Sequence, residues 1–369
     1  MRETIRYIVE EIGTRFGGSP AEHRTAEYLA SRFRACGLDT EMQRFGFIGW
    51  SIDQWPTLEI SSPIKWQIPV SPLLYSASTP PEGATGIIAL RGTTALVPGV
   101  MEMPIYDIVS EKGDRLASLI IEVNGPTIPL INPRAMLQIP QVVIGCEDRR
   151  RLDALLDKSS VCAKLNIRAH VLPEATGYNV TCHAKNPMAE RRVIVCAHMD
   201  TTLNTPGAYD NASGLGALVE LARAVQDIDM TDGIDLVAFA CEEIGFHGSS
   251  YYVNDLKERG LLQRVKACIN LDMVSGGDEL WVWAGPGDFR ERLGDILSRT
   301  EVGARYPLKI SPQRAGGDDW NFHLEGIPGA TMLFWRQDVY HKPIDTLERV
   351  DWQRVSDMVK ATTAIIRDL

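Results

Sequence analysis

The sequence lacks the features that mark nucleic-acid-binding, membrane-spanning and disulfide-rich proteins. Only 38 Lys and Arg stand against 48 Asp and Glu, a net charge of -10, whereas binding to a polyanion requires clustered basic residues. No apolar run reaches the roughly 18 residues of a membrane span. The seven cysteines are odd in number and scattered. We therefore expect free thiols in a reducing compartment rather than a disulfide framework.

The first sixteen residues alternate charged and apolar side chains at helical spacing. They lack the continuous apolar core and the small-residue cleavage site of a signal peptide. We expect a cytoplasmic protein that binds neither nucleic acid nor a membrane, and the sequence gives no indication of its oligomeric state. A chain of 369 residues that is 44% apolar is long enough for one large domain and a smaller one.

The chain changes character twice, which predicts three segments. Residues 1–62 include a helix that Ser19 caps, with Pro20 in its first turn, Glu22 completing a capping box and Gly37 ending it. Residues 63–172 carry prolines, short β runs and one helical stretch, typical of a β-rich insertion. Residues 173–369 alternate strands and helices. This alternation predicts an α/β fold with a mixed, mostly parallel central sheet and helices on both faces.

Polar residues of metal-binding type follow the predicted strands. His198 ends the strand at 192–197, and ligands of an open α/β sheet bind at the carboxyl ends of its strands. A pair of glutamates follows the strand at 234–241. An aspartate follows the strand at 267–271, a histidine comes six residues after Trp335, and another aspartate precedes a helix. The candidate site residues are His198, Asp200, Asp210, Glu242, Glu243, Asp272 and His341.

Carboxylates that converge in one cleft repel one another and are costly to desolvate unless cations neutralise them. Imidazole and carboxylate ligands suit zinc, with cobalt or manganese as substitutes. The ligands exceed what one tetrahedral ion needs, which makes two ions about 3.5–4 Å apart plausible. Neighbouring side chains point in different directions, so Glu243 can bind metal while Glu242 faces the water between the ions. Glu242 would take a proton from that water and give it to the leaving amine, and Asp200 would orient His198.

Five motifs in order carry a family resemblance: "HMD", "YDNASG", "CEEIGFHGS", "NLDMV" and "YHKPIDT". The sequence resembles the di-zinc exopeptidases of metallopeptidase family twenty-eight, which include bacterial leucyl aminopeptidases and glutamate carboxypeptidases. A related peptidase family with a dimerisation domain places its bridging aspartate farther downstream than the ten residues here.

The resemblance assigns a role to each candidate residue except Asp200. It implies that Asp210 bridges two zinc ions and that the peptide bond from Asp210 to Asn211 is cis. It also implies the remaining roles: His198 and Asp272 at one ion, Glu243 and His341 at the other, and Glu242 as general base.

Two parts of the chain depart from that family's pattern. Gly317, Asp318 and Asp319 stand where many members have Ser-Asp-His, and the two aspartates could cap a helix or line the substrate pocket. Residues 63–172 look like a degenerate protease-associated domain. Such insertions sit over the active-site mouth and restrict access to short or flexible chain ends.

We expect a zinc-dependent aminopeptidase that acts on peptides. A carboxypeptidase or dipeptidase of the glutamate carboxypeptidase kind is an alternative. It needs a cationic pocket, which Arg314, Arg336 and Lys342 could supply. The acidic pair Asp318 and Asp319 favours an aminopeptidase, which binds a free amine. A single-zinc glutaminyl cyclase and a non-catalytic, receptor-like relative are the remaining alternatives, and the latter should lack metal ligands.

Overall fold

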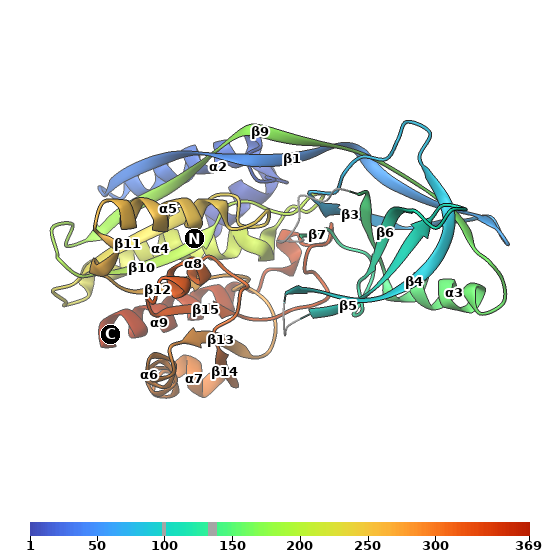
Figure 1. Cartoon of the computed structure of the whole chain (residues 1–369). Helices are drawn as coiled ribbons and strands as arrows, with labels where there is room; N and C mark the ends of the chain where they lie inside the picture. Colours follow the sequence, from blue (N-terminus) through green and yellow to red (C-terminus); the bar gives the residue numbers. More distant parts are fainter. Residues whose placement is uncertain (98–100, 132–138) are drawn as a thin grey trace. The chain divides into compact units, whose positions relative to one another are not determined.

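The computed structural model describes residues 1–97, 101–131 and 139–369, and these form two units (Figure 1). The larger unit comprises residues 1–47 and 175–369, and the smaller comprises residues 48–174. These boundaries fall inside two long strands and differ from the boundaries at 62 and 172 that the sequence predicts. These strands are β1 (Asp39–Ser62) and β9 (Cys162–Lys185). The prolines on which the sequence reading relied begin only where β1 ends.

The larger unit contains a mixed, mostly parallel sheet, which confirms the predicted fold class. Its strand order is β14-β13-β15-β12-β10-β11-β9. The neighbours β15, β12, β10 and β11 are parallel. Strand β13 runs antiparallel to β15 and parallel to β14, and β9 runs antiparallel to β11. The carboxyl ends of the four parallel strands therefore share one edge of the sheet. Their bounds, with those of the two outer strands, are β10 (Arg192–His198), β11 (Gly233–Phe239), β12 (Val265–Leu271), β13 (Leu280–Gly285), β14 (Leu308–Pro312) and β15 (Gly329–Leu333).

Helices connect these strands and cover both faces of the sheet (Figure 1). On one face, α4 packs against β10 and against α9. The first long helix begins as predicted: the Ser19 hydroxyl accepts a hydrogen bond from the Glu22 backbone N–H, and Pro20 is the first helical residue. The helices of this unit are α1 (Arg2–Tyr7), α2 (Pro20–Ala35), α4 (Ser213–Ala224), α5 (His247–Glu258), α6 (Gly287–Ser298), α7 (Glu301–Arg305), α8 (Asp319–Leu324) and α9 (Trp352–Asp368).

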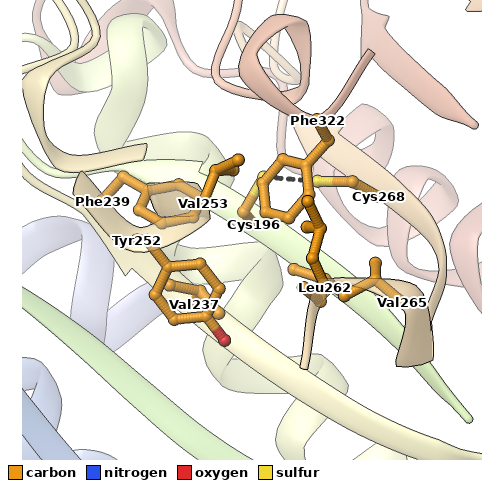
Figure 2. Packing of buried hydrophobic residues seen from close by; sticks show 10 residues of the cluster. Cys196, Val237, Phe239, Tyr252, Val253, Leu262, Val265, Cys268 and Phe322 are labelled. Atoms are coloured by element: carbon orange, nitrogen blue, oxygen red, sulfur yellow. Dashed lines mark hydrogen bonds between the residues drawn. The ribbon is translucent and has the colours of Figure 1, made fainter. Parts of the chain in front are cut away.

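The opposite face of the sheet packs against α5 and α8 through an aromatic cluster (Figure 2). The Phe239 ring, at the end of β11, has its centroid 5.5 Å from that of Tyr252 on α5 and 6.4 Å from that of Phe322 on α8. Beneath these rings, the Sγ atoms of Cys196 and Cys268 lie 3.6 Å apart on neighbouring strands. All seven cysteines are free thiols. The cluster fixes the end of β11, from which the glutamate pair continues.

The smaller unit is rich in β structure. Its strands β4 and β5 pair antiparallel, as do β5 and β6, and β6 then pairs parallel with β8. Strand β8 leads through Gly145 into α3 (Cys146–Leu156), which corresponds to the one helical stretch predicted in this part of the sequence. The remaining bounds are β2 (Trp66–Ile68), β3 (Val70–Leu74), β4 (Ala84–Val97), β5 (Met101–Val109), β6 (Arg115–Ile121), β7 (Leu130–Ile131) and β8 (Gln141–Ile144).

Among the residues that the structure describes, no helix combines the length and the apolar character required to cross a membrane.

Candidate metal centre

The five predicted ligands meet at the edge of the sheet where the parallel strands end. His198 is the last residue of β10, Glu243 follows β11, and Asp272 follows β12 directly. His341 lies in the loop after β15, and Asp210 lies between β10 and α4. All five side chains are buried. The chain therefore concentrates two imidazoles and three carboxylates in one place.

The ligand atoms form two groups that share Asp210. One group is His198, Asp210 and Asp272, and the other is Asp210, Glu243 and His341. Within each group the potential ligand atoms lie within 4.8 Å of one another. Asp210 offers a different oxygen to each group: Oδ1 lies 3.1 Å from His198 Nε2, and Oδ2 lies 3.5 Å from His341 Nε2. Each oxygen of the Asp210 carboxylate therefore faces a different histidine.

Each histidine also faces a second carboxylate through the same ring nitrogen. Nε2 of His198 lies 3.3 Å from Oδ1 of Asp272, and Nε2 of His341 lies 3.1 Å from Oε2 of Glu243. In each group the potential ligand atoms thus lie close enough together to contact one ion.

The electrostatics of the cluster reflect the crowding of acidic groups. Burial raises the pKa of Glu243 to about 7, and the nearby charge of Asp210 adds to the shift. Burial opposes protonation of His198, but the negative charge of Asp272 nevertheless keeps the pKa of that histidine well above its usual value. Burial alone would raise the pKa of Asp210, yet its hydrogen bond with His198 lowers it. Such a cluster attracts positive charge strongly.

The donor set fits zinc. Oε1 of Glu243 is buried and has no hydrogen-bond partner within the described part of the chain, although buried carboxylate oxygens are costly to leave unsatisfied. A bound cation would satisfy this atom. Imidazole nitrogen and carboxylate oxygen are common zinc ligands, and each of the two groups offers one imidazole and two carboxylates.

Glu242 and Asp200 lie beside these ligands. The side chain of Glu242 is partly exposed, unlike that of Glu243, and its carboxylate lies close to ligand atoms of His198 and Glu243. Although Glu242 keeps some contact with solvent, desolvation of its carboxyl group raises its pKa well above the usual value, and the charges of Glu243 and Asp272 add to the shift. Nδ1 of His198 lies 3.2 Å from the backbone oxygen of Asp200 and 3.5 Å from its Oδ1. The Asp200 carboxylate itself accepts hydrogen bonds from the backbone N–H groups of Glu242 and Glu243, both at 3.0 Å. Asp200 thus contacts both ligand-bearing segments.

Two buried charged residues that the sequence analysis missed hold the loop between His198 and Asp210. The Arg15 guanidinium donates to the backbone oxygens of Met199, Pro206 and Gly207 at 2.6, 2.7 and 2.9 Å. Burial lowers the pKa of Arg15 to about 10. Nothing in the local pattern around Arg15 signals this role, because all but one of its partners lie more than 180 positions away in the sequence.

Asp345, within the "YHKPIDT" motif, holds the other end of that loop. Its carboxylate oxygens accept hydrogen bonds from the backbone N–H groups of Tyr209 and Asp210, at 2.6 and 3.0 Å. The peptide bond between Asp210 and Asn211 is cis, as the family resemblance implies. The position of the shared ligand is therefore set by backbone contacts as well as by its own side chain.

Asp318 and Asp319 are both fully buried, but neither caps α8 in the predicted way. Asp318 precedes the helix without a side-chain capping bond, and both oxygens of its carboxylate lack a hydrogen-bond partner in the described residues. Burial raises the pKa of Asp318 to about 8. The Asp319 carboxylate instead accepts hydrogen bonds from Thr331 Oγ1, at 2.6 Å, and from Gln313. The capping interpretation is wrong because α8 begins inside the core, where these carboxylates face side chains from other elements.

The sequence model of Peptidase family M28 matches residues 179–366, about half of the chain. The chain belongs to peptidase family M28. The matched segment of this M28 peptidase contains the five candidate ligands and Glu242, whereas Arg15 lies outside it.

Individual relatives resemble this M28 peptidase over nearly its whole length. Aminopeptidase YwaD of Bacillus subtilis is 27% identical over 98% of this chain and 83% of its own length. The solved structure of BSAP, a zinc aminopeptidase from Bacillus subtilis, has a TM-score of 0.74 and 25% identity, and the match covers 99% of this chain and 92% of the other. A glutaminyl cyclase from Fimbriiglobus ruber shares the fold, with a TM-score of 0.58 and 15% identity over 100% of this chain and 95% of the other.

Proposed function

We propose that this M28 peptidase is a zinc-dependent aminopeptidase that removes N-terminal residues from peptides, with Glu242 as its general base. The observation that carries the proposal is the shared carboxylate of Asp210, with one oxygen toward each histidine. It supports a two-ion site with His198 and Asp272 at one ion, and Glu243 and His341 at the other. Relatives named as aminopeptidases over nearly the full chain support the choice of substrate end.

Each residue of the chain has a distinct task in this proposal. Two zinc ions would lower the pKa of a water molecule and polarise the substrate carbonyl. Glu242, the more exposed member of the glutamate pair, accepts a proton from the attacking water and transfers it to the leaving amine. Asp200 fixes the backbone that carries both glutamates and lies against Nδ1 of His198. His198 thereby keeps its Nε2 directed toward the cluster.

Two of the three cations that could bind a substrate carboxylate already have hydrogen-bond partners, and the guanidinium carbon of the third, Arg314, lies 5.7 Å from the centroid of the Trp283 ring. Both ends of the Arg336 guanidinium donate to the carboxylate of Asp338, at 2.8 and 2.9 Å. Nζ of Lys342 donates to the backbone oxygens of Gln337 and Asp338, at 2.5 and 3.2 Å. Capturing a substrate carboxylate would require these groups to give up their present partners. The contacts therefore favour an aminopeptidase over a carboxypeptidase.

Mass spectrometry of an unblocked peptide incubated with the zinc-loaded protein tests the substrate end. We expect a ladder of products that lose residues from the N-terminus. Loss from the C-terminus would replace the proposal with a carboxypeptidase. Cyclisation of an N-terminal glutamine without a ladder, together with a single tightly bound zinc per chain, would replace it with a glutaminyl cyclase.

Glu242→Gln tests the general base. We expect the variant to keep its zinc and to lose about a hundredfold or more in turnover, because the amide cannot accept the proton. Glu258→Gln, at an exposed position on α5, is the matched control and should turn over like the wild type. An unchanged rate in Glu242→Gln would remove Glu242 from this role. The two-ion stoichiometry and the cytoplasmic location predicted from the sequence remain predictions.

A further inference from the structure

The turn that carries the glutamate pair is held by two buried carboxylates from different parts of the chain. The N–H of Cys241 donates to Oε1 of Glu22 at 2.8 Å. The next two N–H groups, of Glu242 and Glu243, donate to Oδ1 and Oδ2 of Asp200, both at 3.0 Å. Three successive backbone N–H groups thus donate hydrogen bonds to three different carboxylate oxygens. Glu22 supplies one of these oxygens from a position 219 residues away.

Glu22 does more than its place in the capping box requires. The first turn of α2 is already capped by the Ser19 side chain. The Glu22 carboxylate is 1% exposed, and its Oε2 accepts a hydrogen bond from the Gly18 N–H at 2.6 Å, with the Cys241 thiol a further 3.6 Å donor. The side chain therefore connects the N-terminal segment to the turn after β11. A carboxylate buried beside the charge of Asp200 is unfavourable unless its contacts compensate.

The backbone of the turn is unusual at the residue that Glu22 holds. Cys241 has a φ of 59°, in the left-handed region that residues other than glycine rarely adopt. Cys241 directly precedes Glu242. A change in its backbone angles would therefore redirect the Glu242 side chain, while Asp200 would still hold the two N–H groups that follow.

We propose that Glu22 is a positioning residue for Glu242: by holding the Cys241 N–H, it keeps the turn in the conformation that directs Glu242 toward the metal ligands. This inference rests on the proposed role of Glu242 as general base. Glu22 itself does not touch the substrate. Its contribution is expected in turnover rather than in substrate affinity, because a displacement of about 1 Å of a catalytic group can cost roughly a hundredfold in rate.

Glu22→Gln is the variant of choice because it keeps the size of the side chain. The amide has one acceptor oxygen where the carboxylate has two, so either the Gly18 N–H or the Cys241 N–H must face an NH₂ group. We expect kcat to fall roughly tenfold to a hundredfold, with KM within about twofold of wild type and the zinc content unchanged. Glu22→Asp keeps the charge but shortens the side chain, and it should likewise lower kcat while leaving KM nearly unchanged.

Asp357→Asn is the control for general destabilisation. Asp357 is also 1% exposed, and its carboxylate accepts hydrogen bonds from three side chains, those of Arg305, Tyr306 and Gln353. We expect Asp357→Asn to lower the melting midpoint but to leave kcat at the wild-type value. Melting midpoints, zinc content, kcat and KM are measured for all variants with the same peptide substrate.

Glu242→Gln, measured in parallel, separates the two proposals. If Glu242→Gln is fully active, the assigned general base is wrong whatever Glu22 does. If Glu242→Gln is inactive but both Glu22 variants keep the wild-type kcat, the positioning role is wrong. The positioning role would also be wrong if kcat fell as much in Asp357→Asn as in Glu22→Gln. It would likewise be wrong if neither Glu22 variant folded, because Glu22 would then contribute to stability alone.

Discussion

Truncation of Phe322 to alanine should strongly destabilise the larger unit. The Phe322 side chain is fully buried (Figure 2), with its ring centroid 6.2 Å from that of Tyr252 and 6.4 Å from that of Phe239. Burial of a phenylalanine side chain contributes about 2 kcal/mol. A residual cavity of about 80 Å³ adds about 2 kcal/mol at roughly 24 cal/mol per Å³. We therefore expect Phe322→Ala to lower the free energy of unfolding by about 4 kcal/mol.

Urea unfolding followed by circular dichroism, with a chelator present so that bound metal does not contribute, measures this change. Leu324→Ala is the matched control on the same helix, because the Leu324 side chain is 63% exposed. Its free energy of unfolding should stay within about 0.5 kcal/mol of wild type. A loss below about 1 kcal/mol for Phe322→Ala, or equal losses for the two variants, would refute the reasoning, since it would mean that the aromatic cluster contributes little to stability.

Two further predictions concern pH and metal. Burial alone would raise the pKa of Asp235, but hydrogen bonds from Arg192 and His183 lower it below its usual value. Its stabilising effect should therefore be present above about pH 4 and disappear as pH falls through the lowered pKa. The difference in melting midpoint between wild type and Asp235→Asn should shrink as pH falls, and a constant difference would contradict this. Removal of zinc by a chelator should abolish peptide hydrolysis and lower the melting midpoint, with both restored by added zinc, because an ion at a hundred times its Kd stabilises by about 2.7 kcal/mol. A midpoint insensitive to the chelator would contradict metal binding in this cluster.

The sequence predicted the fold and the proximity of the candidate ligands because both depend on local patterns. Alternation of strands and helices implies a parallel sheet, and the carboxyl ends of its strands share one edge. It follows that His198 and Asp272, each at the end of a strand, must lie near each other, and they are 3.3 Å apart. The position of each residue at the end of a predicted strand was sufficient to predict that the two side chains lie close together.

The supporting residues were not predictable in the same way. The capping-box pattern placed Glu22 at the start of a helix, but its carboxylate is bound to the N–H of Cys241, far away in the sequence. Likewise, no local pattern distinguishes Arg15 from a surface arginine, although it is fully buried. The predicted start of the smaller unit, at residue 63, also differs from its start at residue 48 in the structure. The prolines mark the end of β1, whereas the two units separate within that strand.

The larger unit is built from two separate segments, residues 1–47 and 175–369. This division determines the order in which folding and zinc binding can occur during synthesis. The candidate ligands lie between His198 and His341. Arg15 and Glu22 are synthesised early, but they cannot form their contacts with the ligand-bearing segments until the intervening chain has been made. Contacts of such long sequence separation form slowly, because loop closure must precede them. During synthesis, the cluster cannot be complete until residue 341 has left the ribosome. Zinc capture at the assembled cluster should therefore be a late event, and retention of zinc would report that the chain has completed its fold.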